Sequence, residues 1–255
     1  MSSPEPPGSP TPLPRAVLFD LDDTLVVFDP VCGPAWREIC RRHAARAGLS
    51  AEELHREIQQ VSRAFWSDPE RHRAGRLALE ETRAALVAEA LRRRGIADPE
   101  LAGTIASEYS ALQESRIVPF PDALDTLAAL REAGVRMALV TNGNARLQRR
   151  KIERFGLERY MAAFRVEGEL GFGKPDRRVF ERALQALGVA PEETWCVGDN
   201  LEWDVGGAQA VGIAGIWKDN GRRGIPPGPV RPDRIIFQLS ELLGGSPHGP
   251  GPTVR

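Results

Sequence analysis

Two aspartates separated by one residue, Asp20 and Asp22, follow a short apolar run and could carry nucleophilic and acid–base chemistry. Side chains alternate between the two faces of an extended chain. At the end of a strand both carboxylates can therefore lean into one crevice, while Leu21 points back into the core. Two carboxylates held close together suit a nucleophile paired with a general acid/base. Asp20 and Asp22 are the first candidates for catalytic residues.

Two more acids, Asp199 and Asp204, lie in the run GDNLEWD after another apolar segment. We expect this run to follow a neighbouring strand, so that Asp20, Asp22, Asp199 and Asp204 converge. Four like charges held together need a counter-charge. The cluster therefore predicts a bound hard cation with oxygen ligands, and Mg²⁺ fits this best.

Four further residues suit an anion such as a phosphoryl group. Thr141 offers a hydroxyl, and Asn142 and Gly143 offer backbone N–H groups at the start of a predicted helix. Lys174 offers a fixed positive charge. Only three of the 34 basic residues are lysines, which makes Lys174 unusual in this composition. We predict that these four residues bind phosphate.

These motifs, in this order, carry a resemblance to a known family. DLDDT at 20–24, TN at 141–142, KP at 174–175 and GDNLEWD at 198–204 resemble the four motifs of the haloacid dehalogenase-like (HAD) hydrolase superfamily. The resemblance covers roughly residues 15–240. Dehalogenases of the superfamily lack an acid at the position of Asp22 and need no metal, so Asp22 favours the phosphatase branch.

The resemblance implies a role for each catalytic candidate. Asp20 would attack phosphorus and become a transient aspartyl-phosphate. Asp22 would protonate the leaving alkoxide and then deprotonate the water that hydrolyses the intermediate. Thr141 and Lys174 would hold the phosphoryl oxygens, where charge builds up in the transition state.

The resemblance also implies a metal site. Mg²⁺ would be held by Asp20, the backbone carbonyl of Asp22, and Asp199. Asp204 would either bind the metal, directly or through water, or orient Lys174. Both alternatives stay open at this point.

The strands and helices predicted to position these residues indicate an α/β fold. Apolar runs at 15–19, 135–140, 195–197 and 213–217 suit strands buried on both faces of a parallel sheet. Helical patterns at 121–133, 144–155 and 176–187 alternate with the later runs and end at glycines. Alternation of this kind predicts a doubly wound, Rossmann-like parallel sheet.

Residues 29–115 carry only helical periodicity, which predicts an inserted bundle of about four helices. The resemblance places an α-helical cap domain here. Within it, residues 66–76 are polar and rich in arginine, and we expect a connection between helices that could contact substrate. The predicted catalytic core is then 15–28 and 116–243, flanked by a disordered Pro-rich tail at 1–14 and a flexible tail at 244–255.

Composition excludes several other classes of protein. The 34 basic and 35 acidic residues give a net charge of −1, which argues against nucleic-acid partners and anionic membranes. No apolar run could span a bilayer, and the N-terminus lacks a secretory pattern, so we expect a cytoplasmic protein without a membrane partner. The three cysteines show no spacing typical of a zinc site or a disulfide framework.

The sequence therefore predicts a Mg²⁺-dependent phosphatase that acts on a small phosphorylated metabolite, as a monomer or homodimer. One alternative is a phosphomutase that uses the same intermediate. A second is a non-catalytic member that uses the fold as a binding module. The identity of the phosphorylated substrate stays open.

Overall fold

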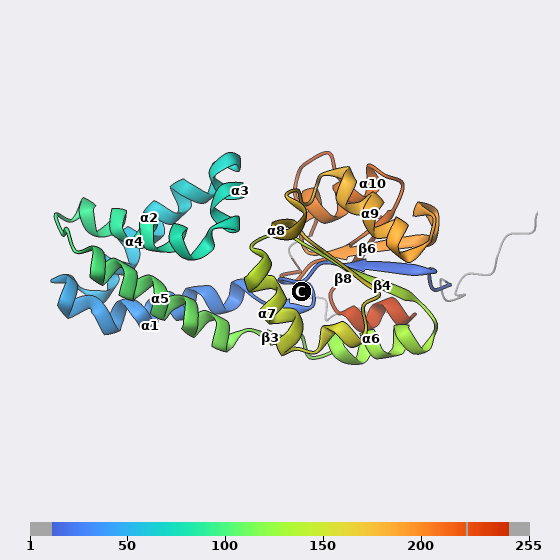
Figure 1. Ribbon diagram of the computed structural model, residues 1–255, viewed down its shortest axis with the longest axis horizontal. Helices are drawn as coiled ribbons and strands as arrows, with labels where there is room; N and C mark the ends of the chain where they lie inside the picture. The colour runs from blue at the N-terminus through green and yellow to red at the C-terminus, as the bar shows by residue number, and fades with distance from the viewer. Residues whose placement is uncertain (1–11, 223, 245–255) are drawn as a thin grey trace, which may run out of the picture.

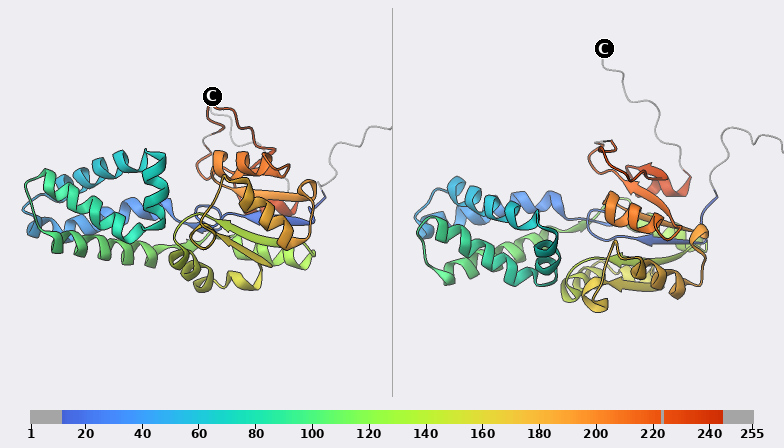
Figure 2. Two further views of the ribbon diagram at one scale, coloured as in Figure 1. Left: turned by 45° about the horizontal axis from the view of Figure 1, so that its top comes forward. Right: turned by 90° about the horizontal axis from the view of Figure 1, so that it is seen from above.

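The computed structural model describes residues 12–222 and 224–244. Residues 1–11 and 245–255 of the two predicted tails lie outside this range. The described chain forms an α/β core and a separate layer of helices beside it (Figure 1). The helical layer extends beyond one end of the sheet in each of the three views (Figure 2).

The core contains a six-stranded parallel sheet with the strand order β5-β4-β1-β6-β7-β8. The strands are β1 (Ala16–Phe19), β4 (Arg136–Thr141), β5 (Ala163–Val166), β6 (Thr194–Gly198), β7 (Ala214–Lys218) and β8 (Arg234–Ile236). This confirms the predicted doubly wound α/β class. The four predicted apolar runs correspond to β1, β4, β6 and β7. The edge strands β5 and β8 are half exposed and carry arginine, so they lack a continuous apolar run.

Helices cover both faces of the sheet, because successive residues of β1 point to opposite sides. Val17 and Phe19 pack with α6 (Ala123–Glu132), α7 (Ala145–Arg154) and η4 (Leu239–Leu243). Ala16 and Leu18 pack against the other face, with α9 (Arg177–Leu187) and α10 (Gly207–Gln209). In Figure 1 the two sets of helices lie above and below the strands.

The helical layer comprises residues 29–116 and has its own hydrophobic cluster. Its helices are α1 (Asp29–Ala47), α2 (Ala51–Trp66), α3 (Pro69–Leu77), α4 (Leu79–Arg93) and α5 (Pro99–Arg116). The expected connection at 66–76 is wrong, because most of it forms α3. Asp68 caps this helix by accepting the Arg71 N–H at 2.9 Å. Polar residues dominate α3, so it shows no apolar stripe.

The chain enters and leaves the helical layer through one short antiparallel pair, β2 (Val26–Val27) with β3 (Val118–Pro119). Single helical turns complete the core: η1 (Leu157–Arg159), α8 (Glu167–Leu170), η2 (Pro191–Glu193) and the π-helical η3 (Leu201–Gly206). Among the described helices, none combines the length and the apolar character needed to cross a bilayer.

Candidate active site

The site forms where the strand order reverses. β1 lies between β4 and β6, so the carboxyl ends of these three strands border one crevice. Asp20 follows β1, Thr141 ends β4 and Asp199 follows β6. Carboxylate oxygens of Asp20, Asp199 and Asp204 lie within 4.8 Å of one another. Of the four acids predicted to converge, these three do, whereas the Asp22 carboxylate is not part of the cluster.

Lys174 lies buried between two of the carboxylates. Its Nζ is 2.5 Å from Asp20 Oδ1 and 2.6 Å from Asp204 Oδ1. The second oxygen of Asp204 accepts the Asn200 N–H at 3.0 Å. Asp204 belongs to η3 and packs against Gly198, where a Cβ atom would overlap the carboxylate. Asp204 therefore fixes both the lysine and the loop that carries Asp199.

The carboxylate cluster is rich in negative charge, and burial shifts the pKa values of its members. The pKa of Asp20 is raised to about 7 by burial, against the attraction of Lys174, with a further increase from Asp204. Burial and the neighbouring Asp20 raise the pKa of Asp199 to about 8. Burial by itself lowers the pKa of Lys174, but the Asp20 and Asp204 carboxylates raise it above its usual value. The cluster thus contains three carboxylates and one ammonium group.

Asp22 pairs with a lysine that the sequence analysis did not select. Lys151 Nζ lies 2.6 Å from Asp22 Oδ1 and 2.7 Å from Oδ2, and Gln148 Nε2 donates to Oδ2 at 3.0 Å. Both partners come from α7. Lys151 is also buried over the Phe28 ring, with Nζ 4.6 Å from the centroid. The scarcity of lysine, already noted for Lys174, was the available signal for Lys151.

The predicted phosphate-binding residues lie together, but several of their groups already have protein partners. The Thr141 hydroxyl accepts from Gln148 Nε2 at 2.9 Å. The Asn142 side chain accepts the Lys174 N–H and donates to the Lys174 carbonyl, each at 2.8 Å. Gly143 N–H donates to Glu167 Oε2 at 2.9 Å. Asn142 thus fastens the lysine loop to β4, while the Gly143 N–H is directed to a carboxylate.

Glu167 in turn joins the core to the helical layer. Its fully buried carboxylate accepts two hydrogen bonds from the Arg76 guanidinium, both 2.7 Å long. The Arg76 guanidinium also lies 5.0 Å from the centroid of the Trp203 ring, which belongs to η3. A helix of the layer is therefore tied to the loop of Gly143 and to the turn that holds Asp204. No signal in the sequence pointed to this pair.

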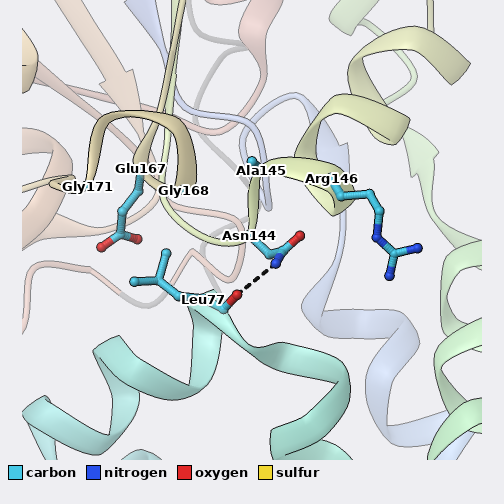
Figure 3. A pocket seen from close by; sticks show the side chains of 7 residues that line it. All are labelled: Leu77, Asn144, Ala145, Arg146, Glu167, Gly168 and Gly171. Atoms are coloured by element: carbon cyan, nitrogen blue, oxygen red, sulfur yellow. Dashed lines mark hydrogen bonds between the residues drawn. The ribbon is translucent and has the colours of Figure 1, made fainter.

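A second contact between the helical layer and the core borders a small cavity of about 360 Å³ (Figure 3). Asn144 Nδ2 donates to the Leu77 carbonyl at 2.7 Å, across the junction of the helical layer and the core. The cavity lies beside this bond, and its lining includes Arg146 and Glu167 but none of the three clustered carboxylates. We assign it to the junction rather than to the active site.

A larger cavity of about 920 Å³ opens onto the carboxylate cluster. The core contributes Asp20, Asp22 and Lys174 to its lining, and the helical layer contributes Trp36, Arg83 and Tyr109. The volume lies within the usual range for small-molecule sites, about 300–1,000 Å³. The carboxylates therefore face a chamber that the helical layer partly closes.

Comparison with known proteins shows which family this chain resembles. A family model described as haloacid dehalogenase-like hydrolase matches residues 14–212. A phosphoserine phosphatase of Thermus thermophilus is 34% identical, over 90% of this chain and 98% of the relative. A glyceraldehyde 3-phosphate phosphatase of Methanopyrus kandleri is also 34% identical, over 79% of this chain and 82% of the relative. The magnesium-bound HAD-hydrolase YfnB of Bacillus subtilis has the same fold, with a TM-score of 0.70 at 21% identity over 91% of this chain and 98% of that one. The chain belongs to the haloacid dehalogenase-like hydrolase family.

Proposed function

We propose that this protein is a Mg²⁺-dependent phosphatase that hydrolyses a small phosphomonoester through an aspartyl-phosphate at Asp20. The observation that carries the proposal is the cluster of Asp20, Asp199 and Asp204 beside the buried Lys174, open to a cavity large enough for a metabolite. Curated relatives named as phosphatases support the choice of phosphoryl chemistry.

The donor set fits Mg²⁺. Carboxylate oxygens are the ligands that a hard cation prefers. Burial, together with the neighbouring carboxylates, raises the pKa values of Asp20 and Asp199, and a cation would offset this negative charge. Asp20, Asp199 and the Asp22 backbone carbonyl would hold the ion. Asp204 would act on it through charge, because its two oxygens face Lys174 and the Asn200 N–H. When bound, Mg²⁺ would offset the negative charge of the phosphoryl oxygens next to the Asp20 carboxylate.

Asp20 would act as the nucleophile. Lys174 holds its Oδ1, and the Thr24 hydroxyl donates to its Oδ2 at 3.3 Å, so the carboxylate has a fixed orientation at the end of β1. The bond from Asp20 to phosphorus forms as the bond from phosphorus to the leaving oxygen breaks. Lys174 and the Thr141 hydroxyl would stabilise the charge of the phosphoryl oxygens.

Asp22 would supply the proton to the leaving oxygen and later take one from the attacking water. Lys151 and Gln148 hold its carboxylate at the edge of the cavity. We propose residues 15–28 and 116–243 as the catalytic core and 29–115 as the cap. A cap over the cavity would exclude bulk water and admit a small metabolite in preference to a macromolecule.

The test is phosphate release from an aryl phosphate by the purified chain. We expect turnover with Mg²⁺, loss of turnover with EDTA, and loss in Asp20→Asn. Asp125→Asn, an exposed acid on α6, is the matched control and should retain activity. Turnover that survives both EDTA and Asp20→Asn would overturn the proposal. Isomerisation of a sugar phosphate without phosphate release would indicate a phosphomutase instead.

A further inference from the structure

Arg83, on α4, contributes a positive charge to the cavity wall formed by the helical layer. Its Nη1 donates to Ser110 Oγ at 2.9 Å, and its Nη2 donates to Gln113 Oε1. The guanidinium carbon lies 4.9 Å from the centroid of the Tyr109 ring. These partners fix the orientation of the guanidinium, but all three are neutral.

In the part of the chain that the structure describes, no carboxylate forms an ion pair with Arg83. Glu80, whose charge acts on Arg83 from the preceding turn of α4, pairs with Arg146 of the core. Burial lowers the pKa of Arg83. A desolvated cation with neutral partners is costly, and an anion that enters the cavity would offset this cost.

Arg83 lies away from the phosphoryl centre, along a continuous series of contacts. Lys151, which pairs with Asp22, packs over Phe28. Cys32, one helical turn further along α1, donates to the Phe28 carbonyl at 3.4 Å. Gln113 donates to Cys32 Sγ at 2.8 Å and accepts from Arg83. Arg83 therefore lines the same cavity as Asp20 and Asp22, on the wall that the helical layer forms.

We propose that Arg83 binds an anionic group at the far end of the leaving group, so that preferred substrates are phosphomonoesters with a second negative charge. The group is a carboxylate or a second phosphoryl, which share the oxygen geometry that a guanidinium recognises. Trp36, stacked on Tyr109 with the ring centroids 3.6 Å apart, stiffens this wall. The proposal rests on the proposed phosphatase function.

Matched substrate pairs test it. Glycerol 3-phosphate is compared with 3-phosphoglycerate, and glucose 6-phosphate with 6-phosphogluconate; the second member of each adds a carboxylate. Fructose 6-phosphate is compared with fructose 1,6-bisphosphate, which adds a phosphoryl group. For each pair, kcat/KM of the charged member is divided by kcat/KM of its partner. We expect a ratio of at least about 10 for one or more pairs, from a charge-assisted hydrogen bond.

In Arg83→Gln this ratio should fall about 10- to 100-fold, and Arg83→Lys should retain part of it. Arg93→Gln, an exposed arginine on the same helix, is the control and should keep the wild-type ratio. A ratio near 1 for every pair, or a ratio unchanged in Arg83→Gln, would overturn the inference. If Arg83 had a purely structural role, Arg83→Gln would lower kcat/KM equally for both substrates of a pair. Failure to hydrolyse even an aryl phosphate would instead refute the proposed phosphatase function.

Discussion

At the scale of single residues, the site depends on two lysines that hold two aspartates. Lys174 fixes Asp20 and Lys151 fixes Asp22, so the proposed nucleophile and the proposed acid/base each have their own cation. The two pairs come from different elements, the loop before α9 and helix α7. This separation lets substitutions distinguish the two roles.

Lys151→Met should impair proton transfer more than phosphoryl binding, because methionine keeps the apolar stem over Phe28 but releases Asp22. The rate should then fall more for a substrate whose leaving group needs protonation than for one whose leaving group does not. We expect the ratio of kcat/KM for an alkyl phosphate to that for p-nitrophenyl phosphate to fall about 10-fold or more. Equal losses for both substrates would show that Lys151 does not act through Asp22.

The carboxylate cluster also predicts how the metal-free protein responds to pH. The pKa of Asp199 is about 8 in the folded protein and near 3.8 without burial, so the folded state binds its proton more tightly. Between these values the folded state carries more protons, and the contribution of Asp199 to the free energy of unfolding falls as pH rises. In urea unfolding with EDTA, the free energy of unfolding should fall less between pH 4 and pH 8 in Asp199→Asn than in the wild type. An equal or larger fall of this free energy in Asp199→Asn would contradict the raised pKa of Asp199.

At the scale of elements, α3 and α8 hold the helical layer against the core. Arg76→Gln would remove the nearer of the two cations at the buried Glu167 carboxylate, leaving Arg73 Nε at 3.9 Å, and would weaken this junction. We expect faster hydrogen exchange in 69–77 and 167–170 and a lower kcat. Arg177→Gln, which removes an exposed pair with Glu181, is the control. Unchanged exchange in Arg76→Gln would show that the junction does not depend on this pair.

The sequence predicted those elements whose pattern is local. β1 and β4 are continuous apolar runs, and α9 starts at a capping aspartate and ends before Gly188, so each carries its own signal. β5 and β8 are short, half-exposed edge strands, and α3 buries little apolar surface, so these three lacked one.

The same distinction separates the site residues. Asp20, Asp22, Lys174 and Asp199 belong to short motifs that are visible along the chain. Their additional partners are set by tertiary structure alone. Asp22 and Lys151 are 129 residues apart, and Arg76 and Glu167 are 91 residues apart. A single sequence contains no periodicity that links such positions, and arginine and glutamate are most often solvated surface residues.

At the scale of the whole molecule, a metal that binds the folded cluster should stabilise the entire chain. Binding to the native state alone adds about 2.7 kcal/mol at a concentration 100 times Kd. Mg²⁺ should therefore raise the thermal unfolding midpoint of the wild type, and raise it much less in Asp199→Asn. Calorimetry in Mg²⁺ and in EDTA measures the difference. An equal rise in both proteins would place the metal elsewhere.

The covalent state of Asp20 during turnover tests the central claim most directly. The purified protein is mixed with an aryl phosphate and Mg²⁺, quenched in acid, and reduced with borohydride, which converts an acyl phosphate to an alcohol. Peptide mass spectrometry should find homoserine at position 20 in the wild type, and no such product without substrate or in Asp20→Asn. Phosphate release with unmodified Asp20, or with the reduced residue at another position, would contradict the assignment of Asp20 as the nucleophile.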